Sequence, residues 1–140
     1  MSESIRCRGW GSGATKIVSD VINRLDLSTI LNKIVGELSH GQRQWVEFGM
    51  VMALKPSLIL LDEPTAGMSS EETKKTAELI LEINKDTTII VVEHDMQFIQ
   101  QIAKLVTVFH QGEILAEDTM SNIQKNEAVR DVYLGRPVNA

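Results

Sequence analysis

Two neighbouring carboxylates follow a short apolar run near the middle of the chain. The run occupies residues 58–61, and Asp62, Glu63 and Pro64 come directly after it. Such a run is typical of a strand buried on both faces of a parallel sheet, and α/β proteins bind ligands where these strands end. Neighbouring side chains on a strand point to opposite faces, so the two acids should have different tasks. One suits a magnesium ion and the other a general base toward water, whereas a strand that simply ends in solvated acids is the alternative.

A polar segment in front of a predicted helix offers hydrogen-bond donors to an anion. Ser39 is suited to cap a helix predicted over residues 41–55, in which Gly41 and Gln42 begin the first turn. Free backbone N–H groups and the positive end of the helix dipole favour an anion, and glycine lets the backbone approach it closely. Taken alone, an ordinary capped helix start explains these residues as well.

A histidine follows a second apolar run, which is rich in β-branched residues and predicts a strand over residues 87–92. His94 comes just after this run, so we expect it at the same sheet edge as Asp62 and Glu63. An imidazole at that edge can hydrogen-bond to a terminal phosphate, although a histidine at a strand end is also a common surface residue. His40 and His110 lack comparable surroundings, and we assign no chemistry to them.

The elements that must position these residues alternate between helix and strand. Glycines in a polar run predict an irregular lead-in over residues 1–14, and apolar residues three and four apart predict an amphipathic helix from Thr15. The remaining pattern predicts helices over residues 70–84 and 95–103, a hairpin over 105–116 and short helices near 121–125 and 127–133. The sequence therefore predicts an α/β fold with an at least partly parallel sheet.

Composition and charge exclude several classes of function. The chain has 140 residues and a formal net charge of −5, without a local lysine or arginine cluster, so a nucleic-acid surface is not expected. Its apolar stretches are far shorter than the roughly 20 residues of a membrane span, and the polar N-terminus does not resemble a secretory signal. A single cysteine, Cys7, excludes an internal disulfide framework.

Together and in this order, the three segments resemble the ATPase domain of ABC transporters. Residues 38–42 match the signature motif, residues 58–64 match Walker B with its catalytic glutamate, and His94 matches the switch histidine. The resemblance runs from about Ile17 to the C-terminus. It implies the C-terminal part of a P-loop NTPase domain with a mainly parallel sheet and flanking helices: residues 15–56 as a remnant of the helical subdomain, and 57–140 as a RecA-like core portion.

The resemblance also implies roles for individual residues. Two such domains pair head to tail, so Ser39, Gly41 and Gln42 would bind the ATP held by a second ATP-binding subunit. Asp62 would serve Mg²⁺, and Glu63 would position or deprotonate the attacking water. His94 would contact the γ-phosphate bound to its own chain. Ser69 stands where the family's D-loop has an aspartate, so the role of that carboxylate is not carried over.

The phosphate-binding loop of the family, Walker A, has no counterpart in the sequence. Its pattern is G-x-x-x-x-G-K-[ST], and in the nearest candidate, residues 9–16, Ala14 and Thr15 break the required order. With the Walker A half absent, the chain supplies about half of a domain, and we expect no ATP binding by the isolated chain. The strand over residues 58–61 then has an open neighbouring position, which favours association with itself or with a partner.

Finer details are similar to the urea and branched-chain amino-acid uptake group. They are residues 39–42 with Trp45, residues 66–68 and 93–96, and the ending 132–135. This implies an ATP-hydrolysing importer component that lies in the cytoplasm, at the inner face of the membrane, on integral permease subunits. The alternatives are a non-catalytic interaction module and a truncated gene product that has lost ATP binding in cis.

Overall fold

The computed structural model describes residues 12–134, which divide into two compact units. The first unit ends at His94 and the second begins at Asp95. The first contains, in order, α1 (Ser12–Arg24), two short 3-10 turns (Ser28–Ile30 and Val35–Glu37), α2 (His40–Ala53), β1 (Leu58–Asp62), α3 (Ser70–Ile83) and β2 (Thr88–Val92). None of the described helices is both long and apolar enough to cross a bilayer.

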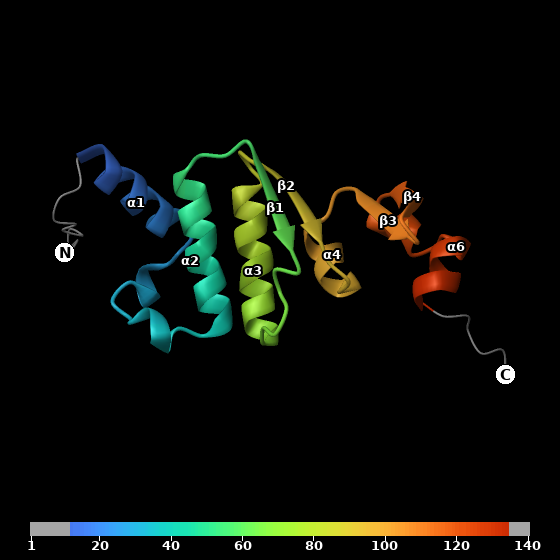
Figure 1. Ribbon diagram of the computed structural model, residues 1–140, viewed down its shortest axis with the longest axis horizontal. Coiled ribbons are helices and arrows are strands. Elements are labelled where there is room, and N and C mark those ends of the chain that lie inside the picture. Colours follow the sequence, from blue (N-terminus) through green and yellow to red (C-terminus); the bar gives the residue numbers. More distant parts are fainter. Residues whose placement is uncertain (1–11, 135–140) are drawn as a thin grey trace. The chain divides into compact units, whose positions relative to one another are not determined.

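The sheet of the first unit consists of β1 and β2, which run parallel with Leu58 opposite Thr88 and Asp62 opposite Val92. This confirms the predicted parallel pairing. Figure 1 shows α2 and α3 side by side, with the two strands next to α3. The first unit therefore has helices on one face of a small parallel sheet.

The two faces of this sheet differ in burial. Ile59 is buried on the face toward the helices, whereas Leu60 is 70% exposed and Val92 is 62% exposed on the opposite face. The prediction of a strand buried on both faces therefore holds for one face only. The described residues supply helices to one side of the sheet, and within this part of the chain β1 has a strand partner on one edge only.

Helix α3 is the central support of the first unit. Its buried Thr76 accepts a hydrogen bond from the indole N–H of Trp45 on α2, with a nitrogen–oxygen distance of 2.9 Å. At its C-terminal end, Arg24 of α1 lies 2.7 Å from the carboxylate of Asp86 and donates to the main-chain oxygen of Glu82 at 2.9 Å. Lys75 lies over the Trp45 ring, 4.9 Å from its centre. These contacts fix α1 and α2 against α3.

The second unit contains α4 (Met96–Ile102), β3 (Val106–His110), β4 (Glu113–Asp118), α5 (Met120–Ile123), α6 (Glu127–Val129) and a π-helical turn (Arg130–Leu134). Strands β3 and β4 form an antiparallel hairpin, as predicted. Its two turn residues, Gln111 and Gly112, have φ values of 51° and 84°, a left-handed pair that matches the twist of such hairpins. A small core of Ile99, Met120, Ile123 and Val129 supports it.

One predicted helix boundary differs from the structure. Helix α1 begins at Ser12 rather than Thr15, since Gly13 falls in a first turn whose N–H groups have no helical partner anyway; the rest of the predicted lead-in lies outside the described residues. The division predicted between residues 56 and 57 falls within the first compact unit, and the assignment of residues 15–56 and 57–140 to two parts of the family's domain stays a prediction.

Candidate functional site

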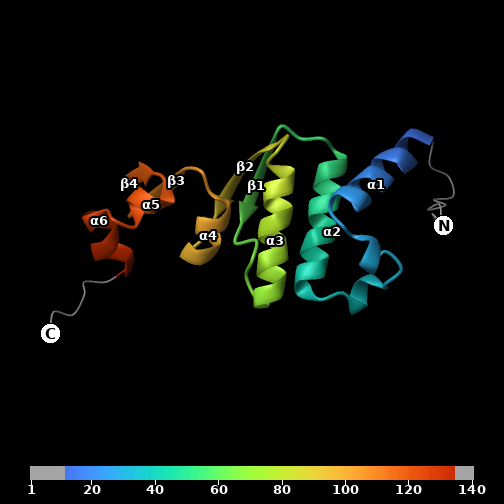
Figure 2. The same cartoon turned by 180° about the vertical axis from the view of Figure 1, so that it is seen from behind.

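All predicted site residues lie at one end of the first unit. The N-termini of α2 and α3 and the carboxyl ends of β1 and β2 point the same way, which Figure 1 and the reverse view in Figure 2 both show. This follows from the chain path, because each helix runs opposite to the strand next to it in sequence. The end combines helix N-termini, which attract anions, with the carboxyl edge of a parallel sheet.

The structure brings Glu63 and His94 together at the ends of the two strands. Oε1 of Glu63 lies 3.4 Å from Nδ1 of His94, and the side chains are 54% and 80% exposed. The backbone N–H of Glu63 donates to the main-chain oxygen of Val92 at 2.9 Å, so the strand pairing continues one residue beyond β1. A carboxylate and an imidazole in contact, both open to water, can orient a water molecule and take its proton.

The backbone at Glu63 has an uncommon conformation. Its φ is +43°, in the left-handed region that side-chain-bearing residues seldom adopt. Such a residue costs about 1–3 kcal/mol and persists only where the surrounding structure holds it, and such residues gather at functional sites. The turn also takes Glu63 out of the strand, so the predicted alternation of Asp62 and Glu63 across a strand does not by itself set where Glu63 points.

Glu93 is a buried carboxylate that the sequence reasoning did not single out. Its side chain is only 2% exposed. One oxygen accepts from the hydroxyl of Thr65, and the other accepts from the backbone N–H of His94 at 2.9 Å and lies 3.6 Å from Nδ1 of the same residue. Glu93 thus links the loop after Glu63 to His94, the residue that faces Glu63. Its place directly before His94, at the end of a strand, was the available signal.

Asp62 ends β1 and is exposed. In the part of the chain that the structure describes, its carboxylate has no hydrogen bond or ion pair, and no group of three or more potential metal ligands occurs. Mg²⁺ in phosphate sites keeps several waters and takes only one or two carboxylates. A single open carboxylate at this edge fits such an ion as one ligand, with phosphate oxygens and water as the others.

Ser39 caps α2 as predicted. Its hydroxyl accepts from the backbone N–H of Gln42 at 3.2 Å, and the side-chain oxygen of Gln42 accepts from the backbone N–H of Ser39 at 3.3 Å. This reciprocal pair is a capping box, which satisfies two of the donors that a helix start leaves open. The ordinary capped helix start is therefore present, and it occupies part of the hydrogen-bonding capacity of both side chains.

A second residue missed by the sequence reasoning, Glu72, lies against this helix start. Its Oε1 accepts from the hydroxyl of Ser39 at 2.5 Å, and its Oε2 accepts from the backbone N–H and the hydroxyl of Ser69, both at 3.0 Å. These hydrogen bonds, that from Ser39 first, hold the pKa of Glu72 below its ordinary value. Ser69 and Glu72 also form the capping box of α3, which is the S-x-x-E pattern in the sequence.

The predicted site residues thus form two groups. Glu63 and His94 make one, with Asp62 at the end of the same strand; Ser39, Gly41 and Gln42 make the other, with Glu72. Among the described residues, no hydrogen bond or ion pair joins the two groups. One group offers a base and an imidazole, and the other offers donors to an anion.

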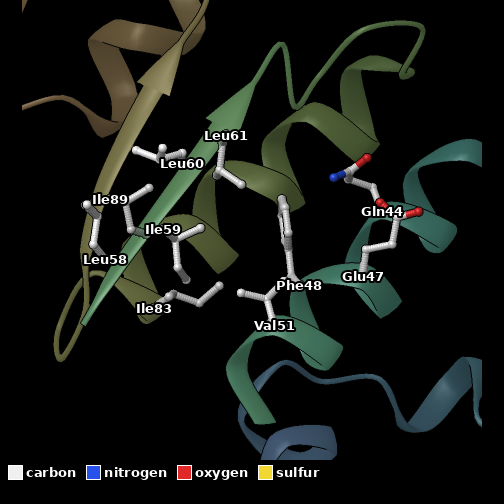
Figure 3. Close-up of a pocket in the computed structure, with 10 residues that line it drawn as sticks. All are labelled: Gln44, Glu47, Phe48, Val51, Leu58, Ile59, Leu60, Leu61, Ile83 and Ile89. Carbon is white, nitrogen blue, oxygen red and sulfur yellow. The ribbon is translucent and has the colours of Figure 1, made fainter. Parts of the chain in front are cut away.

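An apolar groove of about 330 Å³ also lies in the first unit, along β1. Figure 3 shows Val51 of α2 directed toward Ile83 of α3, with Phe48 of α2 beside them on the side facing β1. None of its lining residues belongs to the predicted site. The groove is therefore separate from the residues that carry the chemistry.

Comparisons with known proteins agree on one family. The family model described as "ABC transporter" matches residues 3–66. The branched-chain amino acid transport ATP-binding protein LivG of Escherichia coli is 35% identical over 116 residues, which are 81% of this chain and 46% of LivG. BraF of Pseudomonas aeruginosa is 32% identical over the same shares. The phosphate import protein PstB of Malacoplasma penetrans is 38% identical over 109 residues, 76% of this chain and 38% of PstB.

Solved structures give the same result for the fold. An ATP-binding cassette of an ABC transporter in its ADP conformation superposes with a TM-score of 0.79 and 26% identity, over 92% of this chain and 54% of that one. A nucleotide-free ATP-binding cassette superposes with a TM-score of 0.78 and 25% identity, over the same shares. The chain spans about half the length of the curated relatives and of the solved cassettes that it matches.

Proposed function

The chain belongs to the family of ABC transporter ATP-binding proteins, and on that basis we propose that it supplies the hydrolytic base and the signature helix of an importer ATPase. The observation that carries the proposal is the contact of Glu63 with His94 at the ends of two parallel strands. Catalysis by a positioned carboxylate needs the base exposed to water and held in place. The exposure of Glu63 and the buried link through Glu93 meet both needs.

In this proposal the residues divide the work by their surroundings. Glu63 orients the attacking water and accepts its proton. Nδ1 of His94 lies against Glu63, so Nε2 of the same ring is available to hydrogen-bond to an oxygen of the terminal phosphate. Asp62 supplies one ligand to Mg²⁺, which neutralises phosphate charge when it is bound. Glu93 holds the His94 backbone and the loop after Glu63 in register.

The second group acts on a different nucleotide. Ser39, Gly41 and Gln42 would meet the γ-phosphate of ATP held by a second ATP-binding subunit, in a homodimer or heterodimer. A helix N-terminus suits this task, since its open N–H groups and its dipole favour negative charge. The proposal includes integral membrane permease subunits as partners, at the inner face of the cell membrane.

We propose branched-chain amino acids or urea as the transported substrate. The LivG and BraF relatives are named for branched-chain amino acid transport, and the urea assignment rests on the sequence pattern at residues 66–68 and 93–96. PstB, named for phosphate import, has similar identity. Substrate choice therefore needs a test on the assembled transporter, because the fold does not specify it.

A second candidate is a non-catalytic interaction module, or a truncated product that does not bind ATP in cis. It is favoured by the lack of the G-x-x-x-x-G-K-[ST] pattern in the sequence. The exposed sheet residues Leu60 and Val92 also favour it, because they offer an apolar surface to another polypeptide.

Reconstitution decides between the two candidates. The chain would be co-expressed with the Walker A half of a related cassette, and Mg-ATP binding and hydrolysis would be measured by calorimetry and phosphate release. Hydrolysis by the pair, and by neither part alone, is the expected result. A pair that binds Mg-ATP and leaves it intact would instead establish the non-catalytic module.

A further inference from the structure

The hydroxyl of Ser39 makes hydrogen bonds to other groups of its own chain. A serine hydroxyl has one proton to donate, and Ser39 donates it to Glu72 at 2.5 Å. The same oxygen accepts from the backbone N–H of Gln42 at 3.2 Å. A phosphate oxygen is itself an acceptor and needs a donor. Ser39 therefore has no proton to give to phosphate while Glu72 holds it.

Gly41 is engaged in the same way. A Cβ atom at Gly41 would lie 2.8 Å from Cδ and Oε1 of Glu72, so the absence of a side chain is what lets the carboxylate approach this turn. The pKa of Glu72 is lowered first by the hydrogen bond from Ser39 and least by the backbone of Gly41. Two of the three residues assigned to phosphate binding thus face a carboxylate of their own chain.

Glu72 has a second attachment that does not depend on Ser39. Its Oε2 accepts from the backbone N–H of Ser69 at 3.0 Å, which completes the capping box of α3. The carboxylate can therefore release Ser39 and Gly41 and still cap its own helix. The structure contains one arrangement, in which Oε1 meets Ser39 and Oε2 meets Ser69, and loss of the first contact would leave the second acceptor in place.

We propose that Glu72 is a built-in competitor for phosphate at the start of α2, so that the terminal phosphate of a nucleotide must displace its carboxylate from Ser39 and Gly41. The inference rests on the proposed function, in which these residues bind the phosphate held by a second subunit. The Glu72 carboxylate is negatively charged, as phosphate is, and it occupies the hydrogen-bond donor that phosphate would use. It thereby raises the phosphate concentration at which the signature helix engages.

A titration of the whole chain with inorganic tripolyphosphate tests the competition. Amide shifts of Gly41 and Gln42, followed by NMR, report binding at this helix start. Glu72→Gln removes the charge and keeps a residue that supports the capping box. We expect it to tighten binding about tenfold, which corresponds to about 1.4 kcal/mol. Glu71→Gln is the matched control, because it removes the same charge from the same exposed turn, and it should change the affinity less than about twofold.

A second variant separates contact from charge. Glu72→Asp keeps the negative charge on a side chain one methylene shorter, which draws the carboxylate away from Ser39, and it should tighten binding by less than Glu72→Gln does. Two results would contradict the proposal that Glu72 competes with phosphate. One is an equal tripolyphosphate affinity of the wild type and both Glu72 variants, and the other is an equal gain in affinity in Glu71→Gln and Glu72→Gln. Absence of shifts at Gly41 and Gln42 in every variant, with other residues responding, would instead overturn the phosphate role of α2.

Discussion

The two groups of site residues lie at the same end of the first unit, yet one is open and the other is closed. Glu63 and His94 are 54% and 80% exposed and contact each other loosely at 3.4 Å. Ser39 donates to Glu72 at 2.5 Å, and Gly41 leaves no room for a further atom against that carboxylate. The strand ends thus present their polar groups to water, whereas the hydroxyl and backbone N–H of Ser39 and the N–H of Gln42 already have acceptors within the chain.

The difference follows from what supports each group. The buried Glu93 accepts hydrogen bonds from the Thr65 hydroxyl and from the backbone N–H of His94. It therefore supports the segments that carry Glu63 and His94 without using the exposed atoms of either side chain. The helix start has no such support, and its donors are paired by the nearest carboxylate, on α3. Under the proposed function, this difference would make engagement of a second subunit by α2, rather than activation of the base, the regulated step.

The largest expected effect is on the rate of ATP hydrolysis. If this effect were absent, the contrast between the strand-end pair and the helix start would lose its functional meaning. In the reconstituted pair, Glu63→Gln removes the proposed general base and should lower the hydrolysis rate by about 10²–10⁴-fold, while Mg-ATP binding stays unchanged. Phosphate release and calorimetry measure the two quantities. Glu78→Gln, an equal change in charge at an exposed residue in the middle of α3, should hydrolyse at the wild-type rate. Hydrolysis retained by Glu63→Gln would place the base elsewhere.

The next effect concerns the support behind the open pair. Glu93→Ala removes the acceptor of the part-buried hydrogen bond from the Thr65 hydroxyl and of the exposed one from the His94 N–H, and a hydrogen bond to a charged group contributes about 1.5–3 kcal/mol. We expect the free energy of unfolding, measured with urea, to fall by that amount. Glu78→Ala, on the exposed side of α3, is the control and should stay within about 0.5 kcal/mol. Equal losses in both variants would show that Glu93 is no special support.

A third effect concerns the closed group. Gly41→Ala places a methyl group where the Glu72 carboxylate lies, so that side chain must move. Since its end is flexible, we expect a loss of only about 1 kcal/mol in stability. The pKa of Glu72, followed by carboxyl NMR, should rise toward its ordinary value because the hydrogen bonds from Ser39 and Gly41 are lost. An unchanged pKa would mean that the helix start does not hold the carboxylate.

The smallest effect is on the pH dependence of stability. The folded-state pKa of Glu72 is lowered below its ordinary value, first by the hydrogen bond from Ser39. A carboxyl with a lowered pKa contributes stability above its unfolded pKa and loses it as the pH falls through the folded value. Urea unfolding between about pH 6 and pH 3 should therefore show a smaller acid loss in Glu72→Gln than in the wild type. Glu82 and Asp118, whose pKa values are also lowered, would retain their share in both proteins.

Several features were predictable because they depend on residues close together in sequence. The cap at Ser39, the parallel strands, the hairpin at Gly112 and the family all follow from local patterns that set hydrogen bonding and periodicity. The prediction that β1 would be buried on both faces was wrong for one face, because burial depends on what other elements cover it. The roles of the individual site residues stay predictions.

The sequence by itself determined the types of chemistry: carboxylates and a histidine after apolar strands, and a glycine in the first turn after a capped helix start. Only the tertiary structure decided which groups face each other. Ser39 meets Glu72 across 33 positions, and Thr65 meets Glu93 across 28. Contacts over such separations arise from the packing of α2 on α3 and the pairing of β1 with β2, and they depend on the whole core rather than on any local pattern.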